Sequence, residues 1–99
     1  MAHRIQRSEE DRRGAFFIEE DGARVAQLTY SRSPDGQRAT LHHTEVSEAL
    51  RGQGVARQLV ESAVQWARQE KVRVVPLCSA ARAIFDKEPS FQDVLASSP

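Results

Sequence analysis

Residues 49–61 read ALRGQGVARQLVE, a glycine-containing turn that leads into an amphipathic segment. Gly52 and Gly54 stand one residue apart, directly before a run with the apolar spacing of a helix. Glycine lets a backbone turn sharply and approach a ligand closely, and the N-terminus of a helix attracts anions. The stretch therefore predicts a turn that enters a helix and is able to hold an anion.

The helix that follows is predicted over residues 53–70, because its apolar residues recur with a period near 3.6. This stripe consists of Ala56, Leu59, Val60, Ala63, Val64 and Ala67, with Trp66 at its margin. Residues 72–77 then form a short, nearly continuous apolar run, which is typical of a strand in parallel pairing. Residues 79–88 are predicted to form a second helix, with Ser79 as its N-cap and Pro89 as its end.

Three strands are predicted before the turn. Residues 15–20 and 23–32 flank the pair Asp21-Gly22, which favours a β-hairpin. A second turn at residues 33–36 leads into a strand over residues 37–46. Sequential strands joined by tight turns form an antiparallel meander, and a strand–helix–strand unit adds a parallel neighbour by a right-handed crossover. The order β-β-β-α-β-α indicates an α+β fold with a mixed sheet.

The ends of the chain are predicted to add little to this fold. The whole chain, residues 1–99, is expected to form one small domain. Residues 1–14 are polar and mixed in charge, and Ile5 could belong to a short edge strand. Residues 91–95 are expected to pack back on the domain, and residues 96–99 to form a frayed tail.

Composition excludes several classes of function. The chain has 14 basic and 14 acidic residues and a formal net charge of zero, so we expect no nucleic-acid partner. No apolar run approaches the ~20 residues that span a membrane, and no secretory signal is recognised, so we expect no membrane partner. The single cysteine excludes an internal disulfide and fits a cytoplasmic location. His3, His42 and His43 with one cysteine give no metal-ligand spacing, so no metal is expected.

Two common phosphate-binding patterns do not fit the turn. A P-loop ends in Gly-Lys-Ser/Thr, which the chain does not have there. A dinucleotide fingerprint beginning at Gly52 would need glycine or alanine at position 57, where the chain has Arg57. That fingerprint also belongs to βαβ units, whereas three meander strands come first here.

A third pattern, Arg/Gln-x-x-Gly-x-Gly/Ala, is satisfied by Arg51, Gly54 and Ala56. This turn resembles the pyrophosphate-binding turn of the GNAT superfamily of N-acetyltransferases. The resemblance covers most of residues 15–95 and is most specific in HTEVSEALRGQGVARQLV and VVPLC. It is closest to a small single-domain branch of about this length with a cysteine after the last core strand. The alternative is that the two glycines only make a tight strand-to-helix connection.

The resemblance implies a minimal GNAT-like acyl-CoA N-acyltransferase fold with acetyl-CoA as co-substrate. In this family two core strands splay apart, and the acyl–pantetheine arm enters the gap between them. The backbone of Val46 would then bind the pantetheine amides. The pyrophosphate would lie on the turn, whose residues are Arg51, Gly52, Gln53, Gly54, Val55, Ala56 and Arg57.

Acyl transfer to an amine needs a base, donors for the carbonyl oxygen and an acid for the leaving thiolate. The candidates near the gap are His43, Glu45 and Cys78. Strand alternation places His42 and His43 on opposite faces, with His43 on the face of Leu41 and Glu45. Many larger relatives have a tyrosine where this chain has the cysteine. Cys78 could be the acid, a nucleophile that carries the acyl group, or a buried inert residue.

The function expected from these residues is transfer of an acetyl group from acetyl-CoA to a primary amine. The amine could belong to a small molecule or to a protein, and the oligomeric state is left open. The alternatives are a non-catalytic acyl-CoA binding or sensing module, and a partner-binding domain that keeps the fold without the ligand.

Overall fold

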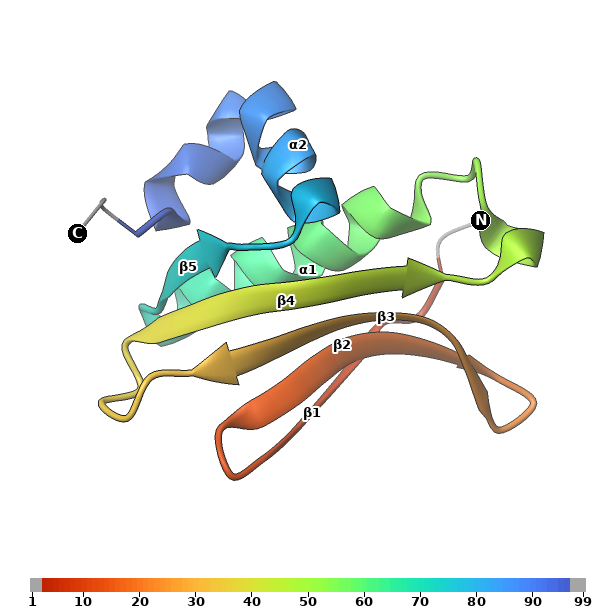
Figure 1. Cartoon of the computed structure of the whole chain (residues 1–99), viewed down its shortest axis with the longest axis horizontal. Coiled ribbons are helices and arrows are strands. Elements are labelled where there is room, and N and C mark those ends of the chain that lie inside the picture. The colour runs from red at the N-terminus through yellow and green to blue at the C-terminus, as the bar shows by residue number, and fades with distance from the viewer. Residues whose placement is uncertain (1–2, 97–99) are drawn as a thin grey trace.

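The computed structural model describes residues 3–96 and contains one mixed sheet of five strands (Figure 1). The strands lie side by side in sequence order; they are β1 (Gln6–Glu10), β2 (Arg13–Glu20), β3 (Ala23–Arg32), β4 (Arg38–Val46) and β5 (Arg73–Pro76). Neighbouring strands from β1 to β4 are antiparallel, and β4 pairs with β5 in parallel. The predicted α+β fold with a mixed sheet is confirmed.

The helical elements follow β4. They are the 3-10 helix η1 (Glu48–Leu50), α1 (Val55–Glu70), α2 (Ser79–Lys87) and the 3-10 helix η2 (Pro89–Val94). Figure 1 shows α1 running behind β4 and β5, with α2 and η2 beside them. The opposite face of the sheet, toward the viewer in Figure 1, carries no helix within residues 3–96. We call it the open face.

The two predicted turns of the meander are confirmed. Asp21 and Gly22 both have positive φ, 52° and 80°, as a two-residue hairpin between β2 and β3 requires. In the next turn the Gly36 N–H donates to the Ser33 carbonyl at 2.8 Å, and Gly36 has φ of 75°.

The strand β1 corrects the description of residues 1–14 as only a polar segment. Gln6–Glu10 pairs with β2, and the turn between them places Asp11 and Arg12 at positive φ of 52° and 65°. The sequence carries no glycine at this turn and no apolar alternation in QRSEE, so both usual signals are missing. The pairing depends on backbone hydrogen bonds and on side chains of β1 that reach Tyr30.

The core lies between the sheet and the helices. Leu59, Val60, Ala63, Val64 and Ala67 of α1 are fully buried, so the predicted apolar stripe is confirmed. Burial of a leucine or valine side chain contributes about 1.5–3 kcal/mol, which makes this stripe the main attachment of α1 to the sheet. The helix begins at Val55, two residues later than expected, because the positive φ of Gly54 (75°) forms its N-cap.

Two expectations at the C-terminal end are wrong. Cys78 and not Ser79 is the N-cap of α2, since its sulfur accepts a hydrogen bond from the Ala81 N–H. Ala96 is not frayed: its N–H donates to the Val74 carbonyl at 2.9 Å, next to a bridge between Val74 and Leu95. The expected packing of residues 91–95 is confirmed by the burial of Phe91 and Val94. The rest of the predicted tail, 97–99, lies outside the described residues.

Candidate functional site

A gap opens where β4 and β5 part. Their pairing ends with Leu41 opposite Pro76, and the N–H groups of Leu77 and Cys78 both point to the Leu41 carbonyl at 3.1 Å. Beyond Leu41 the strand β4 continues to Val46, while the chain after β5 turns away into α2. The second half of β4 therefore has an unpaired edge on the side of β5.

A β-bulge lies at the start of this gap. Thr29 pairs with His43 and Tyr30 with Leu41, so His42 has no cross-strand partner. The extra residue shifts the alternation of side chains by one position. Leu41 is fully buried, whereas His42 and His43 line one hollow on the open face. The expectation that the two histidines face opposite sides, and that His43 shares a face with Leu41, is wrong for this reason.

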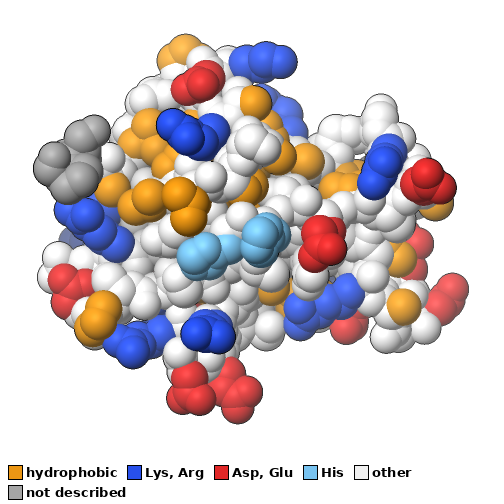
Figure 2. Space-filling view, viewed as in Figure 1, with side chains coloured by type: hydrophobic (Ala, Val, Ile, Leu, Met, Phe, Trp, Pro, Cys, Tyr) orange, Lys and Arg blue, Asp and Glu red, His pale blue; other side chains and the backbone are white. Residues whose placement is uncertain are grey.

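Figure 2 shows histidine side chains, in pale blue, next to one another near the middle of the open face. His42 Nε2 lies 2.7 Å from Ser31 Oγ, which orients its imidazole. His43 is exposed, and no hydrogen bond is recorded for its side chain among residues 3–96. Glu45, two residues further along β4, accepts a hydrogen bond from Gln27 Nε2 at 2.8 Å.

The side chain of Cys78 lies on the other side of β4, toward the helices. Its sulfur accepts the Ala81 N–H at 3.3 Å and lies 3.2 Å from Thr44 Oγ1. Thr44 stands between His43 and Glu45 in the chain, so it points away from the face that they occupy. The structure therefore brings His43 and Glu45 to one face and Cys78 to the opposite one, with the gap between them.

Thr44 was missed by the sequence reasoning. Its contact with Cys78 joins positions 34 residues apart, and strict alternation from Leu41 would have turned Thr44 away from the core. Only the bulge at His42 directs it toward the sulfur.

The backbone of Val46 is available to a molecule in the gap. The Ser47 N–H donates to the Val25 carbonyl at 2.8 Å, which makes Val46 and Ala26 a non-hydrogen-bonded pair of the ladder. Both backbone polar groups of Val46 are thus directed away from β3. The carbonyl accepts a hydrogen bond from Arg51 Nε at 3.3 Å, and no partner is recorded for the N–H within residues 3–96.

The glycine turn presents several free backbone donors. Gly52 and Gly54 have φ of 80° and 75°, a conformation that other residues adopt only with strain. Among residues 3–96 no acceptor is recorded for the backbone N–H groups of 52–57. A Cβ at either glycine would meet no atom within 4 Å, so the turn borders open space. Such a run of N–H groups at a helix N-terminus forms an anion-binding concavity.

The two arginines of the turn differ in their surroundings. Arg51 stays at the mouth of the gap, bound to the Val46 carbonyl. Arg57 forms an ion pair with Glu88 at 3.4 Å, and its guanidinium carbon lies 5.6 Å from the centre of the Phe91 ring. The side chain of Arg57 therefore contacts Glu88 and Phe91, and only its backbone N–H is free to bind an anion at the turn.

A cavity of about 730 Å³ extends along the free edge of Val46 to the first residues of the turn. Its walls come from the ends of β3 and β4, the turn, and the first residues of α1 and α2; they include Thr44, Glu45, Val46, Ser47, Arg51, Ala56 and Ala80. The Ser47 hydroxyl oxygen is buried and has no hydrogen-bond partner among the described residues. Ser47 and Ala80 carry no signal in the sequence, because their place follows from how the elements meet.

Residues 3–96 contain neither a candidate membrane span nor a candidate metal cluster. No helix there is long and apolar enough to cross a membrane. No group of three or more histidine, cysteine, aspartate or glutamate side chains there is arranged to hold a metal ion.

Comparison with known families identifies the class of this fold and site. Residues 15–94 match the model of the GCN5-related N-acetyl-transferase family. The match covers most of the chain, including the meander, the glycine turn and both helices. The chain therefore belongs to the GCN5-related N-acetyltransferases, as the resemblance of the turn predicted.

Solved structures of acetyltransferases have a similar fold. A GCN5-like candidate N-acetyltransferase from Staphylococcus aureus is 31% identical, with a TM-score of 0.66 over 95% of this chain and 90% of that one. The ribosomal-protein-S18-alanine N-acetyltransferase of Escherichia coli is 23% identical, with a TM-score of 0.61 over 80% and 53%. An acetyltransferase predicted in Clostridium acetobutylicum, solved with acetyl-CoA, is 14% identical, with a TM-score of 0.59 over 78% and 56%. The last two show the fold alone. Among curated proteins no match was found.

Proposed function

We propose that the protein is an acetyl-CoA-dependent N-acetyltransferase that transfers an acetyl group to a primary amine. Two observations carry this proposal: the backbone N–H groups of residues 52–57 have no recorded acceptor within residues 3–96, and Ala56 and Arg51 of this turn line the same cavity as the free edge of Val46. A pyrophosphate needs the first of these features, and an extended amide chain needs the second. The family uses acetyl-CoA, and one structural neighbour was solved with it.

In this proposal the N–H groups of residues 52–57 bind the pyrophosphate, including those of Gln53, Val55 and Ala56. Arg51 adds a charge-assisted contact at the mouth. The pantetheine arm pairs with the backbone of Val46 as an added strand segment, and the unpartnered Ser47 hydroxyl supplies a further polar contact. The thioester then reaches the start of the gap, next to the bulge.

The positions of the candidate catalytic residues suggest a division of roles. His43 and Glu45 on the open face take the proton of the attacking amine, directly or through water. The amine nitrogen bonds to the carbonyl carbon, the carbon–sulfur bond breaks, and the CoA thiolate takes a proton from Cys78 on the helix side. In the alternative route, the Cys78 sulfur attacks the carbonyl carbon and the CoA thiolate leaves with the proton of the Cys78 thiol. The amine then attacks the acetyl-cysteine, the carbon–sulfur bond breaks, and the Cys78 sulfur regains a proton from the amine.

A second candidate function is an acyl-CoA binding module without turnover. One observation favours it: the single tyrosine, Tyr30, is not at the gap. Its hydroxyl donates to Glu9 Oε1 at 2.7 Å and accepts from Arg7 at 2.8 Å. Without a tyrosine at the gap, catalysis would depend on Cys78 as the acid that protonates the leaving thiolate, and a module without turnover needs no such acid.

The first test is a thermal shift with acetyl-CoA and with CoA. A ligand at about 100 times its dissociation constant adds ~2.7 kcal/mol of stability. For a domain of this size we expect the midpoint of thermal unfolding to rise by about 10 °C or more. Absence of a shift with both ligands would contradict catalysis and sensing together.

Release of free CoA thiol in the presence of amines then separates the enzyme from the sensor. Cys78→Ala and Cys78→Ser test the thiol, and the thermal shift of each variant reports whether it still binds acetyl-CoA. Loss of turnover with binding retained supports a chemical role for Cys78, whereas unchanged turnover in both variants would exclude it. A mass increase of one acetyl group on the unmodified protein would support the covalent route.

A further inference from the structure

A second hollow, of about 550 Å³, lies on the open face next to the gap and is not part of the acetyl-CoA cavity. It spans three strands. Arg13 pairs with Ser31 across β2 and β3, Ser31 contacts His42, and Thr29 pairs with His43 across β3 and β4. We call these five residues the open-face hollow.

The polar side chains of the open-face hollow are all able to donate hydrogen bonds. They comprise one guanidinium, two imidazoles and two hydroxyls; Gly14 and Tyr30 complete the lining. No aspartate or glutamate lines this hollow, whereas Glu9 and Glu10 line an adjoining one that shares Arg13 and Thr29. A concave surface that contains donors and a cation but no carboxylate is suited to an anion.

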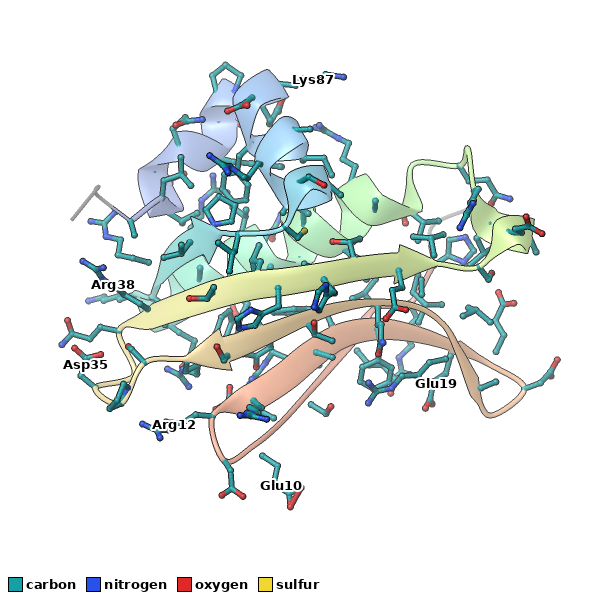
Figure 3. All side chains as sticks on the ribbon, in the orientation of Figure 1. Glu10, Arg12, Glu19, Asp35, Arg38 and Lys87 are labelled. Atoms are coloured by element: carbon teal, nitrogen blue, oxygen red, sulfur yellow. The ribbon has the colours of Figure 1, made fainter. Side chains whose placement is uncertain are left out.

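Arg13 is the charged group of this hollow, and no ion pair or hydrogen bond of its side chain is recorded within residues 3–96. Within residues 3–96 the guanidiniums of Arg7, Arg32, Arg57 and Arg68 pair with carboxylates, and those of the other arginines, Arg13 among them, do not. Glu10 is the cross-strand neighbour of Arg13, yet no nitrogen–oxygen contact within 4 Å joins them. Figure 3 shows Glu10 pointing away from the sheet, below the β1–β2 turn. Arg13 is therefore free to bind a ligand anion.

The row of Arg13 and Ser31 within the hollow lies at a defined distance from His43 and Glu45, the residues proposed to receive the amine. His43 is one row along β4 from the row of Arg13 and Ser31, and Glu45 is the next row. Successive residues on one face of a strand are about 7 Å apart, so these two residues lie about 7 and 13 Å from that row along the strands. Across the sheet, β4 lies two strand spacings, about 10 Å, from the backbone of Arg13 on β2, a separation that the long arginine side chain partly spans. Glu45, held by Gln27, supplies the negative charge that an ammonium group prefers.

We propose that the open-face hollow binds a carboxylate of the acceptor, so that the acceptor is a primary amine on a flexible arm ending in a carboxylate. The carboxylate lies against Arg13, Ser31 and His42, and the amine lies between His43 and Glu45, next to the bulge where the gap begins. The position of the amine rests on the proposed acetyltransferase function, whereas the carboxylate site does not.

The test compares two probes that differ only in charge, 6-aminohexanoate and 6-aminohexanamide. Each is titrated into the isotope-labelled full chain, and binding is followed by NMR at the signals of Ser31, His42 and His43. We expect the carboxylate probe to bind about 2–5-fold more tightly, since Arg13 is exposed and an ion pair with an exposed guanidinium contributes up to about 1 kcal/mol. Arg13→Gln should remove this difference and leave the binding of the amide probe unchanged.

Arg38→Gln is the matched control, because Arg38 is exposed at the far end of β4 and points away from the hollow (Figure 3). It should preserve the preference for the carboxylate. Equal affinity for the two probes, or a preference that survives Arg13→Gln, would overturn the inference. Neither result would affect the thermal shift with acetyl-CoA, so failure of this site and failure of the proposed function are separable.

Discussion

At the scale of single residues, Tyr30 shows how surroundings exclude a side chain from a role. The phenol is buried in an aromatic cluster with Phe16 and Trp66 and is hydrogen-bonded to Glu9 and Arg7. Burial, helped by the hydrogen bond to the Glu9 carboxylate, raises the pKa of Tyr30 to about 12. A phenol held so strongly in its neutral form, with its hydroxyl engaged by Glu9 and Arg7 of β1, serves packing and not proton transfer.

This pKa predicts a loss of stability at alkaline pH. Unfolded, the phenol titrates near 10, so the free energy of unfolding is unaffected by Tyr30 below that pH and falls as pH rises from 10 toward 12. Because the chain has one tyrosine, phenolate absorbance reports this group alone. We expect Glu9→Gln to lower the pKa of Tyr30, and Glu10→Gln, on the exposed side of the same strand, to leave it unchanged. Equal titration curves for all three proteins would contradict the assignment.

Gly54 allows backbone strain and ligand binding to be measured separately. Alanine at its φ of 75° should reduce the free energy of unfolding by about 1–2 kcal/mol, without a clash, because no atom lies within 4 Å of the new Cβ. Gly22→Ala is the control, since Gly22 has φ of 80°, equally open space and a place in the β2–β3 hairpin. Both variants should melt earlier, but only Gly54→Ala should weaken acetyl-CoA binding, measured by calorimetry. Equal affinities in the two variants would argue against the turn as the pyrophosphate site.

At the scale of elements, apolar periodicity predicted α1 and the turn residues predicted the meander, because both signals are local in the sequence. The apolar stripe from Leu59 to Ala67 has a helical period, and Asp21-Gly22 has the dihedral preference of a hairpin turn. In contrast, β1 has neither apolar alternation nor glycine, and it forms because β2 offers an edge to pair with.

The bulge in β4 explains why the site was only partly predictable. Two adjacent histidines give no sign that one of them leaves the ladder, and a shift of one position changes the face of every later side chain. The glycine turn could be predicted because its conformation requires glycine at fixed positions. The contact between Thr44 and Cys78 and the ion pair of Arg57 with Glu88 could not, because both depend on how β4, α1 and α2 come together.

At the scale of the whole molecule, the C-terminal segment, residues 89–96, covers the free edge of β5. The carboxylate of Asp93 links this segment to α1. Arg68 Nε and Nη2 bind the two oxygens of Asp93 at 2.9 Å each, and Arg73 donates to the Asp93 carbonyl at 2.6 Å. Two residues beyond, Leu95 and Ala96 pair with Val74. The same segment carries Phe91, against which Arg57 at the start of α1 packs. Closure of the sheet edge is thus coupled structurally to the helix that begins at the glycine turn.

The ion pair between Arg68 and Asp93 predicts that the protein loses stability in acid. The hydrogen bonds from Arg68 hold the pKa of Asp93 below its ordinary value, so the stabilisation is complete above that value and is lost as pH falls through the lowered pKa. Asp93→Asn should unfold at lower denaturant concentration at neutral pH and should show a smaller further loss on acidification. Asp86 is an exposed carboxylate of α2 and has no ion-pair partner among residues 3–96. Asp86→Asn should therefore keep the acid dependence of the unmodified protein. If Asp93→Asn retained the full acid dependence, another carboxylate would have to cause it, which would contradict the role given to Asp93.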